Sequence, residues 1–188
     1  MKNSDFINKR LHEELQHFKN RVFELENLAV TDSLTGLYNN RYFKDRLDQE
    51  IERSKRYKKP LCLLMIDIDD FKKCNDTHGH LEGDCLIIEI SKMLTKESRL
   101  ADIVCRYAGD EFVIILPEAD VVRAKIYANK IRVAVNELEL KCKPSISIGI
   151  CELAIGMDTT SIIDKADKAM YKAKHAGKNR ISDLVEVL

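Results

Sequence analysis

Acidic residues follow apolar stretches of the sequence at two places where the chain must turn. Asp67 ends one such stretch, Asp69 and Asp70 come directly after it, and Asp110 and Glu111 lie between two further apolar stretches. Carboxylates crowded together repel one another, and some stay protonated at neutral pH unless a cation joins them. Ligation by carboxylate oxygens, completed by phosphate oxygens, suits Mg²⁺. The residue types therefore predict a magnesium site, provided that the fold brings the two places together.

Such a site could perform phosphate chemistry. Two divalent cations can activate an attacking hydroxyl and neutralise a leaving pyrophosphate. The alternative interpretation is that surface turns are acidic in any case. It is plausible for Asp69 and Asp70, but less so for Asp67, which emerges directly from a continuous apolar run.

Candidate phosphate contacts accompany the acidic residues. The segment 67–73 is expected to form a turn with free backbone amides and two lysines, and such a nest can cradle a triphosphate. Near the C-terminus, the segment 171–180 supplies five basic residues, one of them a histidine. This second segment fits a phosphate clamp and a solvated helix end equally well, because basic residues at a helix end also stabilise the helix dipole.

Asn75 and Asp84 flank a glycine-containing stretch and could read a guanine base. A carboxylate accepts hydrogen bonds from N1–H and the N2 amine of guanine, whereas adenine has no donors there and would leave the carboxylate unpaired. Taken alone, the two residues fit turn and N-cap positions equally well, and that interpretation is preferred on this evidence.

The elements that must position these residues follow from hydrophobic periodicity and turn signals. The expected elements are helices at 41–57, 81–96, 119–137 and 160–175, and strands at 61–67, 103–107, 112–116, 145–151 and 181–187. The order after the first helix is β-α-β-β-α-β with a further helix and strand, which predicts an α+β sandwich: a ferredoxin-like palm with a mainly antiparallel central sheet flanked by helices. In this fold the first strand and the hairpin strands can be neighbours, which would bring Asp67 close to Asp110 and Glu111.

Residues 1–30 are expected to form a separate amphipathic helix ahead of the domain at 31–188. A heptad seam with spacings of 4, 3, 4, 3 and 4 runs along it, through Leu11, Leu15, Phe18, Val22, Leu25 and Ala29. The seam predicts a short, dimerising coiled coil. The alternative is a helix folded onto its own domain, since three heptads are marginal alone.

Composition excludes several classes of protein. Hydrophobic residues make up 45% of the chain, enough for a core, and the formal net charge is zero, which gives no reason to expect a nucleic-acid or membrane-surface partner. No apolar run approaches the ~20 residues that span a bilayer, so a cytoplasmic domain is expected.

The six cysteines show no metal-ligand spacing. They are interpreted as reduced, buried thiols rather than as a zinc site or a disulfide framework.

Five segments in order resemble the motifs of the GGDEF family of diguanylate cyclase domains. The matching segments are DSLTGLYNNR at 32–41, DIDDFKKCND at 67–76, GHLEGD at 79–84, RYAGDEF at 106–112 and YKAKHAGKNR at 171–180. One such motif would be weak evidence, but five in the expected order are highly specific. The resemblance covers nearly the whole chain outside the first helix. Residues 106–112 are called the signature turn below.

The resemblance implies that two GTP molecules are condensed into cyclic di-GMP, with release of two pyrophosphates. The implied ligands of Mg²⁺, or of Mn²⁺ in its place, are Asp67, Asp110, Glu111 and the carbonyl of Ile68. Glu111 is alternatively implied to help deprotonate the 3′-hydroxyl. The implied nucleotide contacts are Asn75 and Asp84 to guanine, Lys174 and Lys178 to phosphates, and the Phe71 and Lys72 amides to the terminal phosphates.

The resemblance also implies a homodimer. Each monomer would bind one GTP, and the two sites would face each other so that each 3′-oxygen attacks the other nucleotide; a dimerising first helix would favour this proximity. Arg99 and Asp102 match the family's RxxD site for product inhibition, and arginine can bind guanine O6 and N7 bidentately. Feedback inhibition by cyclic di-GMP is therefore expected.

Three positions depart from the family pattern. Ala108 replaces the first glycine of the signature turn, Asn40 replaces an arginine, and Lys178 replaces another arginine. Ala108 favours an alternative, in which the domain is catalytically silent and binds GTP or cyclic di-GMP as a signalling receptor. A third interpretation, a general nucleotidyltransferase palm, would not need the guanine and RxxD residues. The retained acidic residues favour the active cyclase.

Overall fold

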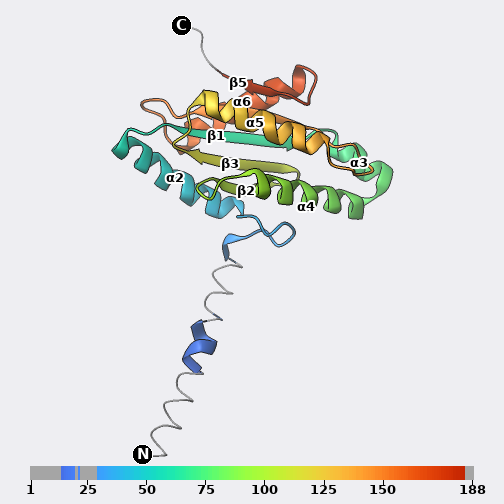
Figure 1. The fold of residues 1–188 in the computed structure, drawn as a ribbon, viewed down its shortest axis with the longest axis horizontal. Coiled ribbons are helices and arrows are strands. Elements are labelled where there is room, and N and C mark those ends of the chain that lie inside the picture. Colours follow the sequence, from blue (N-terminus) through green and yellow to red (C-terminus); the bar gives the residue numbers. More distant parts are fainter. Residues whose placement is uncertain (1–13, 20, 22–28, 185–188) are drawn as a thin grey trace, which may run out of the picture.

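The computed structural model describes residues 14–19, 21 and 29–184. Its core is a five-stranded sheet with helices on both faces (Figure 1). The elements in chain order are α2 (Asn40–Tyr57), β1 (Leu61–Ile68), α3 (Phe71–His78), α4 (His80–Glu97), β2 (Ile103–Ala108), β3 (Glu111–Pro117), α5 (Val121–Asn136), β4 (Ile146–Glu152), α6 (Thr159–His175) and β5 (Ile181–Asp183).

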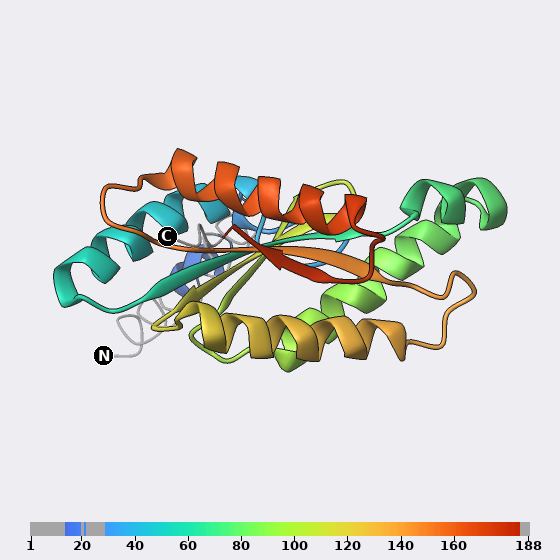
Figure 2. The ribbon, with the colours of Figure 1, turned by 90° about the horizontal axis from the view of Figure 1, so that it is seen from above.

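The strand order β2-β3-β1-β4-β5 confirms the predicted ferredoxin-like fold. All neighbouring strands are antiparallel except β4 and β5. Helices α2 and α6 cover one face of the sheet, and α4 and α5 cover the other (Figure 2). Side chains alternate along β1, so its even-numbered residues pack towards α4 and α5 and its odd-numbered ones towards α2 and α6. Both faces of this central strand are therefore buried, as its continuous apolar sequence indicates.

The helix α3 differs from the expectation, because the segment after the acidic residues was expected to remain a turn. It begins after Asp70, which has a left-handed φ of 57°, and ends at Gly79, whose φ is 85°. Cys74 is its one buried residue. With so few apolar positions, this short helix has no periodicity that distinguishes it from a loop.

The cysteines also differ from the expectation. Cys74 and Cys142 form a disulfide, so the prediction that all six are reduced thiols is wrong for this pair. Cys85 is exposed, which contradicts the prediction of burial for that residue. Only the remaining three cysteines are both free and buried, as predicted.

The close packing of α6 on β4 depends on Gly149. A side chain at this position would overlap the carbonyl oxygen of Ala166 and the backbone nitrogen of Met170. The absence of a Cβ therefore allows the helix backbone to lie directly against the strand. This contact sets the position of α6, whose C-terminal end lies near the end of β1.

The outer edge of β2 is covered by the chain that precedes α2. Tyr38 forms a parallel bridge with Cys105 and an antiparallel bridge with Thr31. The amide of Arg106 donates to the Tyr38 carbonyl at 2.8 Å. This contact joins the segment that enters the domain to the strand that leads into the signature turn.

The predicted N-terminal coiled coil lies largely outside the described residues, which exclude Leu11, Val22 and Leu25. Residues 14–19 are helical, and Leu15 and Phe18 within them are 51% and 65% exposed. The division at residue 30 and the dimer remain predictions. None of the helices that the structure describes is long and apolar enough to cross a membrane.

Candidate active site

The two acidic segments meet at one end of the sheet. Asp67 lies directly opposite Glu111 in the antiparallel pairing of β1 with β3. The amide of Ile68 donates to the backbone carbonyl of Asp110 at 3.2 Å, which holds the signature turn against the end of β1. The topology therefore brings together the carboxylates that are 43 or 44 residues apart in sequence.

The electrostatics of this cluster centre on Asp67, which is only 6% exposed. Lys174 of α6 reaches it, with Nζ 2.6 Å from the carboxylate oxygen Oδ2. Burial raises the pKa of Asp67 to about 6; Lys174 opposes this rise, and the nearby Asp110 and Glu111 add to it. Burial also raises the pKa of Glu111. The cluster is thus short of positive charge, and a further cation would favour its ionised form.

The cluster alone is not a complete metal cage. Among the residues that the structure describes, no group of three histidine, cysteine or acidic side chains is arranged to hold a metal ion. Mg²⁺ commonly binds through one or two carboxylates and completes its octahedral shell with waters and substrate phosphates. The paired strand ends carrying Asp67, Asp110 and Glu111 fit that kind of ion, and the Ile68 carbonyl lies in the same segment as Asp67.

Asp69 has a structural role instead. Its carboxylate accepts hydrogen bonds from the hydroxyls of Ser145 and Ser147, both at 2.7 Å, and from the amide of Asn179 at 2.9 Å. These contacts fasten the acidic loop, residues 67–70, to β4 and to the basic closing segment, residues 171–180. Asp69 is only 9% exposed, so the alternative of an ordinary acidic surface turn does not describe it either.

The basic closing segment folds over the acidic loop. Lys178 donates to Asp70 with 2.7 Å between Nζ and Oδ1, while Lys174 pairs with Asp67. The structure thus brings Lys174 to the predicted metal ligand Asp67, and Lys178 to Asp70 in the loop that follows it. A helix end that was merely solvated would not require this convergence, so the geometry favours a phosphate clamp.

The backbone amides of Phe71 and Lys72 lie in the first turn of α3, immediately after the acidic loop. The first N–H groups of a helix have no partner within the helix, and they favour anions together with the helix dipole. The side chain of Asp70, the residue before the helix, makes no capping hydrogen bond. These amides are therefore available to an anion beside the acidic loop.

Asn75 and Asp84 lie on adjacent helices, α3 and α4, and neither is an N-cap. The preferred interpretation from sequence, that Asn75 and Asp84 are turn and N-cap residues, is therefore wrong. Asn75 Oδ1 is buried and has no hydrogen-bond partner in the described part of the chain. Gly83 lies against it so closely that a side chain at Gly83 would overlap this oxygen. Because buried acceptors are nearly always paired, Asn75 Oδ1 is a candidate acceptor for a ligand. Asp84 follows Gly83 in the sequence and is exposed.

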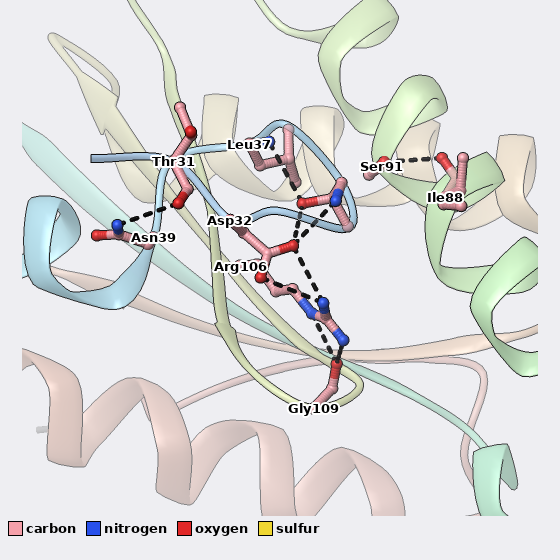
Figure 3. A network of polar contacts seen from close by, with 9 residues as sticks. Thr31, Asp32, Leu37, Asn39, Ile88, Ser91, Arg106 and Gly109 are labelled. Atoms are coloured by element: carbon pink, nitrogen blue, oxygen red, sulfur yellow. Dashed lines mark hydrogen bonds and ion pairs between the residues drawn. The ribbon is translucent and has the colours of Figure 1, made fainter. Parts of the chain in front are cut away.

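Sequence reasoning did not identify the network that holds the signature turn (Figure 3). Arg106 donates through Nη1 to Asp32 Oδ1 at 3.0 Å, and through Nε and Nη2 to the Gly109 carbonyl at 2.9 and 2.8 Å. Burial alone would raise the pKa of Asp32, but hydrogen bonds from Thr35 and Arg106 outweigh it and lower the pKa. The available signal was the acid that begins the segment 32–41 and the arginine at the start of the signature turn.

The Arg99–Asp102 turn lies at the other end of β2 from the signature turn. The amide of Arg99 donates to Asp102 Oδ2 at 2.8 Å, and the amide of Asp102 donates to the Arg99 carbonyl at 3.0 Å. Burial raises the pKa of Asp102. A cavity of about 560 Å³ is lined by Arg99, Leu100 and Asp102 of this turn and by Tyr38 from the segment before α2. This second candidate site is therefore separate from the carboxylate cluster.

The substitution at Ala108 is compatible with the turn. Ala108 is exposed at the end of β2, next to an irregularity in its pairing with β3. The left-handed conformation is adopted by Gly109, with a φ of 48°, and not by Ala108. The position that most needs a glycine has therefore kept it.

Comparisons with known proteins identify relatives of this chain. The sequence profile of the family described as "Diguanylate cyclase, GGDEF domain" matches residues 29–180. Response regulator PleD of Caulobacter vibrioides is 37% identical in an alignment of 173 residues that covers 88% of this chain and 38% of PleD. Diguanylate cyclase A of Treponema denticola is 36% identical in an alignment of 168 residues that covers 85% of this chain and 45% of that protein. The chain thus spans less than half the length of these two relatives.

Solved structures show the same fold. The GGDEF domain of DgcB from Caulobacter crescentus, in complex with c-di-GMP, is 31% identical with a TM-score of 0.79 and covers 82% of this chain and 95% of its own. Diguanylate cyclase SiaD of Pseudomonas aeruginosa, in complex with its activator SiaC, is 29% identical with a TM-score of 0.82, covering 97% of this chain and 72% of its own.

Proposed function

This chain belongs to the GGDEF family of diguanylate cyclase domains, and we propose that it condenses two GTP molecules into cyclic di-GMP, releasing two pyrophosphates. The observation that carries the proposal is the meeting of Asp67 with Glu111 at paired strand ends, beside Asp110 and within reach of Lys174. This arrangement supplies carboxylates for a cation and a lysine for phosphate at one place.

In this proposal the cluster holds Mg²⁺, or Mn²⁺, through Asp67, Asp110, Glu111 and the Ile68 carbonyl. A cation held there would supply the positive charge that favours ionisation of the 3′-hydroxyl and departure of pyrophosphate. In the alternative role, Glu111, whose pKa is raised by burial, does not bind the cation and instead helps to accept the proton of that hydroxyl. The 3′-oxygen then bonds to the α-phosphorus of the facing nucleotide, and the bond from that phosphorus to pyrophosphate breaks.

The triphosphate is bound by groups that surround the acidic loop. Lys174 and Lys178 exchange their carboxylate partners for phosphate oxygens, since both already lie at the loop. The amides of Phe71 and Lys72 bind the terminal phosphates at the N-terminus of α3. The helix therefore contributes backbone donors where the lysines contribute charge.

Guanine is selected by the two helices beside the loop. Asn75 Oδ1, buried and unpaired among the described residues, accepts from the base, and Asp84 accepts from N1–H and the N2 amine. Incubation with Mg²⁺ and GTP should therefore yield pyrophosphate and cyclic di-GMP, measured by chromatography and mass spectrometry. ATP should turn over at least about 10³-fold more slowly, because it leaves the carboxylate unpaired. GTP binding without turnover would instead support a silent receptor.

The reaction requires two copies of the domain. One site holds one GTP, so two domains at 31–188 must face each other as a homodimer, and the helix at 1–30 raises their effective concentration. The proposed location is the cytoplasm, where GTP and Mg²⁺ are available.

The Arg99–Asp102 turn is proposed to bind the product and inhibit the enzyme. Arg99 is exposed beside the cavity described above, and its guanidinium can bind guanine bidentately. Replacing Arg99 by alanine should raise the inhibition constant for cyclic di-GMP about tenfold or more, the worth of one such contact. Initial rates at increasing product concentration would measure it, with Arg56→Ala on α2 as the matched control. Equal inhibition of the wild type, Arg99→Ala and Arg56→Ala would show that the turn does not bind the inhibiting product.

A further inference from the structure

Apart from Cys85, which is free and exposed, the cysteines of this chain divide into two sets with different reactivity. Cys62, Cys105 and Cys151 are buried, and burial raises the pKa of each thiol, to about 12 for Cys105 and about 11 for Cys151. Buried apolar thiols of this kind are unreactive because the thiolate is the reactive form. Cys74 and Cys142 instead form a disulfide between segments that are 68 residues apart.

The disulfide joins two segments that border the proposed nucleotide site. Cys74 lies in α3 directly before Asn75, and Cys142 lies in the connection between α5 and β4. The same connection leads to Ser145, whose hydroxyl binds Asp69 in the acidic loop. The connection is therefore fastened twice, once to the loop that precedes α3 and once to the middle of α3.

The covalent tie adds to a small noncovalent anchorage, since α3 otherwise packs mainly against α4, where Gly83 lies against Asn75 and Phe71. Of its eight residues, all of which are described, Cys74 alone is buried, and Phe71 packs partly against the core. The helix nevertheless carries three proposed nucleotide contacts: the amides of Phe71 and Lys72, and the side chain of Asn75. A bond that fixes Cys74 therefore fixes the residue next to it, the proposed guanine reader.

The disulfide is also accessible to small molecules. A cavity of about 310 Å³ is lined by both cysteines and by Lys73 and Lys143, their neighbours in the chain. Positive charge close to a cysteine favours its thiolate, the form that exchanges with disulfides. Asp69 and Asp70 also line this cavity, so the two lysines stand beside carboxylates there. The pair thus adjoins a cavity and has a lysine next to each cysteine in the chain.

We propose that Cys74 and Cys142 are a redox-controlled site, in which the closed disulfide holds α3 in position for GTP and reduction weakens GTP binding. The inference rests on the proposed function. In the reduced protein the thiolate of Cys142, the more exposed of the two, attacks a low-molecular-weight disulfide and releases one thiol. Cys74 then attacks the sulfur of Cys142 and releases the second thiol. Two protein thiols are oxidised as one small disulfide is reduced, and a dithiol reverses the exchange.

The test compares the full chain with its disulfide closed and after reduction with dithiothreitol. Calorimetry would measure the affinity for a GTP analogue with a methylene bridge between the α- and β-phosphorus, which cannot react. Reduction should weaken binding about fivefold, or ~1 kcal/mol, and should speed hydrogen exchange in α3. The Cys142→Ser variant should resemble the reduced protein and ignore dithiothreitol, whereas Cys85→Ser should keep the full response.

Three outcomes would be decisive. Equal affinity and equal exchange in α3 before and after reduction would overturn the inference, as would a redox response that persists in Cys142→Ser. Faster exchange on reduction, with no binding of the GTP analogue in either state, would support the covalent tie and overturn the proposed function.

Discussion

Replacing Asp110 by alanine is expected to abolish the formation of cyclic di-GMP. The rate should fall at least about 10³-fold, because the variant loses a carboxylate that is proposed to contact the cation throughout the reaction, worth ~4 kcal/mol at the barrier. The fold should persist, since the contact that holds the turn uses the Asp110 backbone carbonyl, which alanine retains. Release of pyrophosphate from GTP would measure the effect.

The matched control for this variant is Asp45→Ala, which removes an exposed carboxylate from α2. It should leave both turnover and thermal stability unchanged. If Asp110→Ala kept more than about a tenth of the activity, a loss of under ~1.4 kcal/mol, Asp110 would not have the proposed role.

Replacing Gly149 by alanine should have the largest effect on stability. The added Cβ would overlap backbone atoms of Ala166 and Met170, which cannot move unless the whole of α6 moves. We expect the free energy of unfolding to fall by more than about 4 kcal/mol, a loss reached only by severe core disruption. Urea denaturation would measure it. Because α6 also carries Lys174, any folded fraction should bind nucleotide more weakly.

Two further variants identify the cause of that loss. Gly156 has a φ of 82° and open space around its Cβ position, so alanine there should cost only about 1–2 kcal/mol of backbone strain. Adding Met170→Ala to Gly149→Ala should not restore stability, because the overlap is with backbone. Equal losses in the two single glycine variants would contradict the packing argument.

The sheet and its flanking helices could be predicted from sequence because their patterns are strong. The continuous apolar run of β1 indicated a strand buried on both faces, and the break at 108–111 indicated a hairpin. Helix α3 could not be predicted because only Cys74 is buried in it. The disulfide to Cys142 was also hidden, since nothing in a spacing of 68 residues indicates which cysteines meet.

The candidate site was predictable to the extent that topology decides it. The pairing of β1 with β3 brings Asp67 to Glu111, and the strand order alone implies this. The individual polar partners were not predictable. The contact of Arg106 with Asp32 spans 74 residues, and the closure of Lys174 onto Asp67 depends on how closely α6 packs against β4.

The covering of β2 by Tyr38 has a consequence for how copies of this protein can associate. An open strand at the margin of a sheet is a template for augmentation by another chain. Here one margin is bridged by the segment around Tyr38, and the other is β5, which has only three residues. Continuous growth of the sheet from one molecule into the next is therefore disfavoured, which leaves helices and loops as the surfaces through which two copies can meet.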